Sequence, residues 1–247
     1  MKILIISDLH ANLEAIEALP NKFDQLWVLG DLVNYGPDPA AAIAYVRRHA
    51  AMAIRGNHDH AVAFGEDPRC SVRFRRMAEE TCRYTRSVLT EDELRYLRGL
   101  PLKAGCEIAG RHFLLCHAAP SNPLYEYRPP DSPLWGDVAK ETWSEIMLIG
   151  HTHLPFRRAF GGKTIVNPGS VGQPKHGRAE ACYALWEDGK FTLDSVAYNV
   201  EATVAKLHSL PLSADVLEDL VYVLRNGEIP PAPGDRQADP VTDCNSR

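Results

Sequence analysis

Short runs of apolar residues alternate with helical patterns along the first part of the chain. Residues 2–6, 25–29 and 51–54 are mostly apolar and have the length of buried strands. Between them, residues 12–19 and 38–48 place apolar side chains at the spacing of an amphipathic helix. Strands that alternate with helices in this way predict a βαβαβ unit built on a parallel sheet.

Two further predicted helices precede a second half that is rich in strands. Residues 71–89 carry an apolar stripe at helical spacing, and residues 90–97 begin with a capping box. Residues 118–137 are rich in proline and aromatic residues and predict a loop. The rest of the pattern predicts strands at residues 102–109, 111–117, 146–149, 156–160, 164–166, 181–186 and 191–198, and helices near residues 200–209 and 213–225.

The domain organisation follows from where the apolar pattern stops. Residues 1–228 contain every predicted strand and helix, and we expect them to form one domain. Residues 229–247 combine several prolines with few apolar side chains. Such a composition buries too little surface to offset the entropy of ordering the chain, so we expect a disordered tail.

Polar residues cluster where the apolar runs end. In open α/β sheets this is the place where ligands bind. The side chains are carboxylates, imidazoles and one amide, which suit divalent first-row metals. The clusters are Asp8-Leu9-His10, Gly30-Asp31, Gly56-Asn57-His58-Asp59, His117 and Gly150-His151-Thr152-His153. Together they predict a site for two metal ions.

The spacing within two clusters supports this interpretation. Residues i and i+2 of an extended segment point the same way, so Asp8 and His10 can reach one ion together. The same holds for His151 and His153. Asp31 carries two oxygens and could bridge both ions. One such cluster alone is a weak signal, but five of them at consecutive strand ends form a specific pattern.

Composition and charge restrict the classes of function. The chain has 247 residues, of which 45% are hydrophobic and 24% charged, and its net charge is −5. An acidic balance disfavours bulk binding of nucleic acid. No stretch approaches the roughly 20 apolar residues of a membrane helix, and the first apolar run is too short for a signal peptide. We therefore expect a cytoplasmic protein with reduced cysteines and no membrane partner, for which a homo-oligomer remains open.

The order of the clusters resembles the calcineurin-like metallophosphoesterase superfamily. Residues 167–174, Asn-Pro-Gly-Ser-Val-Gly-Gln-Pro, are similar to a motif of its small bacterial and archaeal phosphodiesterase branch. The resemblance runs from residue 1 to about residue 225. It implies an α+β fold with α/β character, a four-layer αββα sandwich in which two mixed β-sheets lie face to face, and a dinuclear metal site.

The resemblance also implies a role for each polar residue. One ion would be held by Asp8, His10 and His153, and the other by Asn57, His117 and His151, with Asp31 as the bridge. His58 would be no ligand but the general acid near the leaving group. The implied metal is manganese first, with iron, zinc, cobalt or nickel as alternatives.

The implied activity is hydrolysis of a small, nucleotide-like phosphodiester by a hydroxide that bridges the metals. Phosphomonoesters and dinucleotide polyphosphates remain alternative substrates of the same site. A non-catalytic scaffold is disfavoured, because every ligand position and position 58 are filled. After Asp31 the chain has Leu32-Val33-Asn34-Tyr35 where Ser/Thr phosphatases have an arginine. With no cation there for the extra charge of a monoester, we expect a preference for diesters.

Loop residues supply weaker candidates for substrate binding. Tyr35 and Tyr125 could stack on a nucleobase or simply pack their own loops. Tyr127 and Trp135 lie in the same predicted loop and carry the same two alternatives. Arg178 could fold over the site and bind phosphate.

Overall fold

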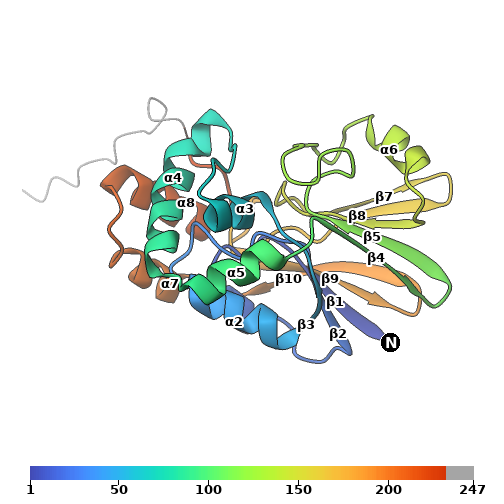
Figure 1. The fold of residues 1–247 in the computed structure, drawn as a ribbon, viewed down its shortest axis with the longest axis horizontal. Coiled ribbons are helices and arrows are strands. Elements are labelled where there is room, and N and C mark those ends of the chain that lie inside the picture. Colours follow the sequence, from blue (N-terminus) through green and yellow to red (C-terminus); the bar gives the residue numbers. More distant parts are fainter. Residues whose placement is uncertain (232–247) are drawn as a thin grey trace, which may run out of the picture.

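A computed structural model of the chain describes residues 1–231, and it contains two five-stranded sheets with helices on their outer sides (Figure 1). The predicted tail lies almost entirely outside the described residues. Within them, the backbone carbonyls of Pro230 and Pro231 accept hydrogen bonds from Arg73, at 3.1 and 2.8 Å from its Nη2.

The first sheet is built on the predicted βαβαβ unit. Its strand order is β10-β9-β1-β2-β3, in which β1, β2 and β3 are parallel and β9 runs antiparallel to β1. The hairpin β9–β10 therefore adds two C-terminal strands to the N-terminal unit. The strands are β1 (Lys2–Ile6), β2 (Gln25–Val28), β3 (Ala50–Ala53), β9 (Glu180–Glu187) and β10 (Lys190–Ala197).

The second sheet comes from the middle of the chain. Its order is β4-β5-β6-β8-β7, with β5, β6 and β8 parallel and with β4 and β7 antiparallel at the two edges. The strands are β4 (Lys103–Ile108), β5 (Arg111–Cys116), β6 (Ile146–Leu148), β7 (Phe156–Phe160) and β8 (Lys163–Asn167). Both sheets are mixed, as the resemblance implied.

The two sheets pack face to face through one apolar layer. The ring centroids of Trp27 on β2 and Phe113 on β5 are 5.2 Å apart, and both side chains are buried. Ile3, Ile5 and Leu148 belong to the same layer. Alternate residues of a strand point to opposite faces, so Leu4 and Ile6 of β1 pack instead beneath the helices on the outer side.

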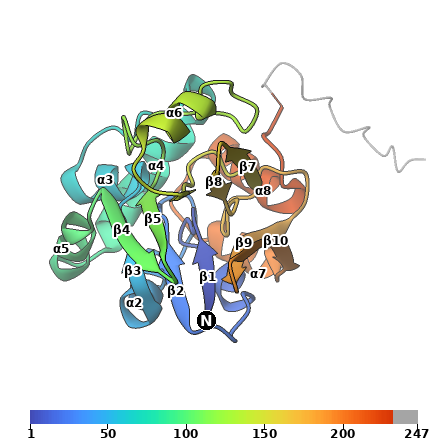
Figure 2. The same ribbon diagram turned by 90° about the vertical axis from the view of Figure 1, so that its right-hand side faces the viewer.

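Helices cover both outer faces and complete the four layers (Figure 2). α6 packs on β7 and β8, and α1 and α2 pack on the first sheet. α4, α7 and α8 enclose a separate apolar cluster beside it. The helices are α1 (Leu13–Glu17), α2 (Pro39–His49), α3 (Asn57–Phe64), α4 (Val72–Val88), α5 (Glu91–Gly99), α6 (Trp135–Glu141), α7 (Val200–Leu207) and α8 (Ala214–Asn226). The predicted α+β sandwich is confirmed.

The sequence did not predict α3 and α6. The first turn of α3 is polar yet buried, so α3 has no amphipathic pattern that could reveal it. α6 begins at Trp135, inside the segment predicted as a loop, and continues beyond the predicted end of that loop at residue 137. The side chain of Trp135 is buried. Both are short helices whose stability comes from tertiary packing rather than from propensity.

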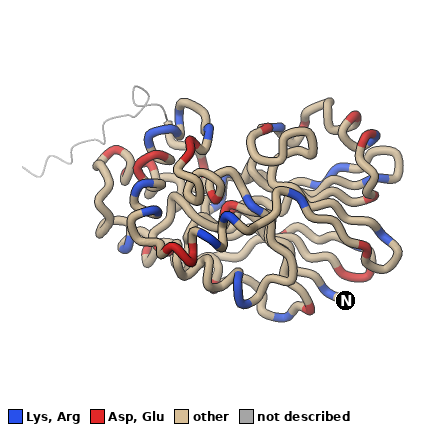
Figure 3. The backbone as a smooth tube through the Cα atoms, in the orientation of Figure 1, with Lys and Arg blue, Asp and Glu red and all other residues tan. Residues whose placement is uncertain are grey.

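Charged residues lie mainly on the helices and outer loops, and both signs are interspersed there (Figure 3). Among the described residues, no helix has the length and apolar character needed to cross a membrane.

Candidate metal centre

The polar clusters meet at one end of the sandwich. Asp8, Asp31 and Asn57 follow the parallel strands β1, β2 and β3, whose carboxyl ends share one edge of the first sheet. The second sheet contributes His117 after β5 and His151 after β6. Because the sheets stack, the two sets of loops face each other and bring these side chains into one buried site.

The backbone at these loops is unusual. Non-glycine residues rarely adopt positive φ, because the Cβ then lies too close to the backbone. Five candidate ligands nevertheless have this conformation, with φ values of 54° at Asp8, 45° at His10, 55° at Asp31, 65° at His151 and 62° at His153. Strain concentrated at one site indicates that the surrounding structure enforces the geometry.

Gly56 allows the loops of two strands to approach each other. A Cβ at this position would lie 2.0 Å from Oδ1 of Asp31 and 2.4 Å from its backbone nitrogen. Only glycine therefore fits beside the Asp31 carboxylate.

The first cluster combines Asp8, His10 and His153. The Nε2 atoms of the two histidines are 3.2 Å apart, and Nε2 of His153 lies 3.4 Å from Oδ1 of Asp8. Each ring donates its Nδ1–H to a backbone carbonyl, that of Val33 for His10 and that of Gln173 for His153. Both Nε2 atoms must then present lone pairs to each other, which is repulsive unless a cation lies between them.

The second cluster has the same construction. Nδ1 of His117 donates to the Leu29 carbonyl at 2.8 Å, which directs Nε2 toward Asp31 Oδ2 at 3.2 Å and Asn57 Oδ1 at 3.1 Å. Burial lowers the pKa of His117, but the Asp31 carboxylate outweighs burial and raises it to about 9. Nδ1 of His151 lies 3.1 Å from the same amide oxygen. The ligand atoms of Asp31, His117 and His151 all lie within 4.8 Å of one another, and those of the first cluster satisfy the same limit.

Asp31 stands between the clusters. Its Oδ2 is 3.2 Å from Nε2 of His117 and 4.0 Å from Nε2 of His10. Oδ1 of Asp8 and Oδ2 of Asp31 are buried without a hydrogen-bond donor. Buried carboxylate oxygens that lack donors are costly, and a bound cation would neutralise both. The residues present therefore fit two divalent ions.

The electrostatics of the site agree with this arrangement. Burial lowers the pKa of His10 and of His153 well below the ordinary value, so both rings are neutral. Burial also lowers the pKa of His151 to about 3. Neutral imidazole is the form that binds metal.

His58 lies beside the two clusters, and its ring centroid is 5.2 Å from that of His10. Its Nδ1 is 2.7 Å from Nδ2 of Asn34, and its Nε2 is 3.4 Å from Sγ of Cys70. The orientation of the Asn34 amide is set by its neighbours, because Oδ1 accepts from the Tyr35 N–H and Nδ2 also donates to the Ala78 carbonyl. Asn34 therefore donates to Nδ1 of His58, and the proton of the neutral ring is on Nε2.

Asp59 organises the loop that carries Asp31. Its carboxylate accepts hydrogen bonds from the backbone N–H of Asp31 and Leu32 at 2.8 Å, of Gly56 at 3.0 Å and of Val33 at 3.3 Å. No role for Asp59 was predicted from the sequence. Its position three residues after Gly56, at the start of α3, is the capping-box spacing that could have indicated it.

The aromatic candidates divide into two groups. The ring of Tyr35 is 4.8 Å from that of His10 and 4.6 Å from that of His58, and the ring of Tyr127 is 5.9 Å from that of His151. These two rings border the site. By contrast, Tyr125 packs against the guanidinium of Arg69 at 4.3 Å, and Trp135 is buried in the α6 cluster.

The arginine candidate makes its contacts elsewhere. Nη2 of Arg178 donates to Oγ of Ser195 at 3.1 Å, and Nη1 lies 3.4 Å from Glu180. These interactions hold Arg178 on the β9–β10 hairpin. The charge of Lys175, a residue not predicted from the sequence, acts on the candidate ligands His10, His151 and His153. Its only sequence signal is its place directly after the Asn-Pro-Gly-Ser-Val-Gly-Gln-Pro motif.

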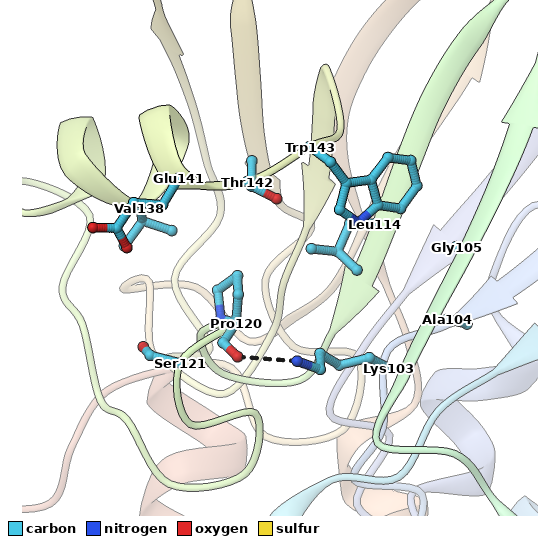
Figure 4. Close-up of a pocket in the computed structure, with 10 residues that line it drawn as sticks. All are labelled: Lys103, Ala104, Gly105, Leu114, Pro120, Ser121, Val138, Glu141, Thr142 and Trp143. Atoms are coloured by element: carbon cyan, nitrogen blue, oxygen red, sulfur yellow. Dashed lines mark hydrogen bonds between the residues drawn. The ribbon is translucent and has the colours of Figure 1, made fainter.

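A separate hollow lies on the outer side of β4 and β5. The close-up shows Lys103, Trp143 and Leu114 around it, next to the end of α6 (Figure 4). The Nζ of Lys103 donates to the Pro120 carbonyl at 3.2 Å. None of the residues that line this hollow belongs to the two clusters.

Comparison with known proteins finds the same family over most of the chain. Residues 1–188 match the family model of the calcineurin-like phosphoesterase superfamily domain. The crystal structure of a metallophosphoesterase from Sphaerobacter thermophilus is 30% identical and has a TM-score of 0.77, covering 89% of this chain and 98% of its own.

Two curated relatives also cover most of both sequences. The protein MJ0912 of Methanocaldococcus jannaschii is 29% identical over 228 residues, which are 83% of this chain and 91% of the relative. Phosphodiesterase YfcE of Escherichia coli K12 is 24% identical over 225 residues, which are 84% of this chain and 97% of the relative.

Proposed function

The chain belongs to the calcineurin-like phosphoesterase superfamily and is a metal-dependent phosphoester hydrolase, and on this basis we propose that it hydrolyses phosphodiester bonds of small, nucleotide-like substrates at a dinuclear centre. The observation that carries the proposal is the position of Asp31 between two clusters of candidate histidine ligands, with buried carboxylate oxygens that lack donors. The name of the relative YfcE supports diesters as the substrate class.

In this proposal each cluster holds one divalent ion. Asp8, His10 and His153 would hold the first ion. Asn57, His117 and His151 would hold the second, and Asp31 would be shared by the two. Mixed nitrogen and oxygen ligands suit manganese, iron, cobalt, nickel or zinc, and we propose manganese as the native metal. When bound, two such ions neutralise the phosphate and supply a hydroxide nucleophile near neutral pH.

His58 is the general acid of the proposal. The acid is the protonated ring, which returns to neutral imidazole when its Nε2 proton passes to a departing alkoxide oxygen. Burial lowers the pKa of His58, but Cys70 and Asp31 outweigh burial and raise it above its ordinary value, which favours this protonated form. The backbone N–H of His58 donates to Oδ1 of Asp31 at 2.9 Å, which ties its position to the centre. Proton donation of this kind contributes about 10²–10⁴-fold to the rate.

The test is reconstitution of the metal-free protein with each of the five metals, followed by assays on mono- and diesters that include cyclic nucleotides. We expect two ions per chain and activity on diesters. His153→Ala should lose one ion, whereas the control His112→Ala, at the far end of β5 from His117, should keep both. A protein that binds less than one ion per chain and hydrolyses no ester would contradict the proposal.

A phosphomonoesterase or dinucleotide-polyphosphate hydrolase is the second candidate for the same site. The observation that favours it is the ammonium group of Lys175 beside the two clusters.

A further inference from the structure

Lys175 follows a segment that is fixed to the candidate metal centre. The Gln173 carbonyl accepts the Nδ1–H of His153 at 2.6 Å, and Oγ of Ser170 donates to the Asp8 carbonyl at 2.8 Å. The backbone N–H of Gly172 also donates to the Asp8 carbonyl, at 2.9 Å. The backbone two residues before Lys175 is therefore held next to the first cluster.

The ammonium group of Lys175 packs on an aromatic ring, and it has no acidic partner in the part of the chain that the structure describes. Its Nζ lies 4.5 Å from the centroid of Phe74, at the start of α4. Within residues 1–231, no carboxylate oxygen lies within ion-pair distance of this Nζ, and the side chain is half-buried. A cation in such a place gains from any anion that binds beside it.

The charge of Lys175 acts on both halves of the centre. Burial lowers the pKa of the ammonium to about 8, while the carboxylates of Asp8 and Asp31 oppose this shift. The positive charge of Lys175 in turn contributes to the lowered pKa values of His10, His151 and His153. The charge of Lys175 thus acts on candidate ligands of both ions.

Two arginines of α4 are already paired. Arg73 contacts the carboxylate of Asp219 at 3.2 Å, and Arg76 pairs with Asp215 and with Glu80. Arg178 is likewise held by Glu180. By contrast, the ammonium group of Lys175 has no such ion pair within residues 1–231 and can bind an incoming phosphate.

We propose that Lys175 determines substrate specificity. Its ammonium group binds one phosphate oxygen beyond those that two metal ions would neutralise. This contact favours phosphoesters that carry a second negative charge. A diester phosphate has two non-bridging oxygens, one for each ion of the proposed centre. A monoester has a third, and its second ionisation is near pH 6. In a dinucleoside polyphosphate the adjacent phosphate offers the extra oxygen. The inference rests on the proposed phosphoester hydrolysis.

The experiment compares p-nitrophenyl phosphate with bis(p-nitrophenyl) phosphate, which share a leaving group and differ in charge. A dinucleoside tetraphosphate is the third substrate, and the enzyme is reconstituted with Mn²⁺. The variants are Lys175→Met, which keeps the apolar stem, and Lys175→Arg, which keeps the charge. Lys190→Met on the exposed end of β10 is the control for net charge.

We expect Lys175→Met to lower kcat/KM for the monoester, the tetraphosphate or both by about tenfold or more, the size of a lost hydrogen bond to a charged group. The loss for the diester should stay below about threefold, with KM changing more than kcat. Lys175→Arg should restore most of the activity, and Lys190→Met should change nothing. A loss only for the monoester identifies a terminal phosphate, and a loss only for the tetraphosphate identifies an adjacent phosphate.

Binding of inorganic phosphate, followed by titration calorimetry, gives a second measurement. Lys175→Met should weaken phosphate binding by about tenfold while metal content and melting temperature stay unchanged. Equal losses on all three substrates, or unchanged values for all, would overturn the inference. If the wild-type protein hydrolyses none of the esters, the proposed function fails, and the phosphate titration still decides whether Lys175 binds phosphate.

Discussion

Nε2 of His58 lies 3.4 Å from the thiol of Cys70, and the same thiol lies 3.5 Å from the hydroxyl of Tyr35. Cys70 thus lies next to the Nε2 proton that His58 would donate to a leaving group. Burial raises the pKa of the Cys70 thiol, but the charge of His58 outweighs burial and lowers this pKa below its ordinary value. The remaining cysteines that the structure describes have raised pKa values, about 12 for Cys116 and Cys182.

The first prediction concerns this thiol. Because the thiolate is the reactive form, Cys70 should react with iodoacetamide faster than the other described cysteines at pH 7 to 8. Peptide mapping by mass spectrometry identifies the site of modification. The bulky adduct should lower activity in the wild type, whereas Cys70→Ala should keep its activity after treatment. Preferential labelling of Cys116 or Cys182 would contradict the assignment.

The second prediction separates the proposed roles of His58. His58→Ala should leave metal content unchanged and lower kcat, most strongly for esters with poor leaving groups. An activated aryl oxide hardly needs a proton, whereas an alkoxide does. The measurement is kcat for a series of diesters with leaving groups of increasing pKa. Losses that are equal across the series would indicate that His58 positions the phosphate instead.

The third prediction addresses the bridge. Asp31→Asn should reduce bound metal and remove most activity, because a neutral amide cannot neutralise two dications as a carboxylate does. Metal analysis and steady-state kinetics check both effects. Asp24→Asn, which changes an exposed carboxylate at the start of the first sheet, is the matched control. A variant with two ions and near-normal turnover would refute the bridging role.

The fourth prediction concerns Asp59, whose carboxylate accepts hydrogen bonds from four backbone N–H groups. Asp59→Asn should lower the free energy of unfolding of the metal-free protein by about 2–4 kcal/mol, since an amide cannot satisfy these donors as a carboxylate does. Denaturant unfolding measures the change. Asp24→Asn removes a single exposed contact and should cost less than about 1 kcal/mol.

The fifth prediction is a pH dependence far from the metal centre. Burial raises the pKa of Glu14, but the hydrogen bond from Lys206 and other contacts lower it below its ordinary value of 4.5. A carboxylate with a depressed pKa in the folded state stabilises the fold above pH 4.5, and this contribution is lost as the pH falls through the folded value.

Lys206→Met tests this contribution. Lys206 is 38% exposed and also pairs with Asp38, so its loss should cost about 1 kcal/mol or less at pH 7 because solvent screens the pair. The difference between wild type and variant should shrink as the pH falls below 4.5 and disappear once Glu14 is protonated in the folded protein. A difference that persists at low pH would show that the lysine stem, rather than the ion pair, stabilises the fold.

The sequence predicted the parts of the site that depend on strand ends. Asp8, Asp31 and His117 follow apolar runs, and parallel strands bring their carboxyl ends to one edge whatever the details of the loops. The roles of Asn34, Cys70 and Lys175 could not be predicted in the same way. Each of these roles depends on which loop or helix packs against the site, and no periodic pattern in the sequence predicts that packing.

The same limit explains where the structure places two residues away from the surroundings that the sequence suggested. Arg178 has the right charge and follows a site motif, but the β9–β10 hairpin supplies nearer partners in Glu180 and Ser195. Trp135 lies in a proline-rich segment that resembles a surface loop, yet its ring fills the space above the second sheet. Local composition indicates neither outcome, because both depend on contacts between distant segments.

The left-handed backbone at the candidate ligands has an evolutionary consequence. An L-residue in this conformation costs roughly 1–2 kcal/mol, and glycine adopts it freely. With respect to backbone strain alone, glycine is the less costly residue at His10 and His153, so the strain is the cost of placing imidazoles there. In a lineage that no longer needs the chemistry, these are the positions where drift should begin, while the apolar layer between the sheets persists.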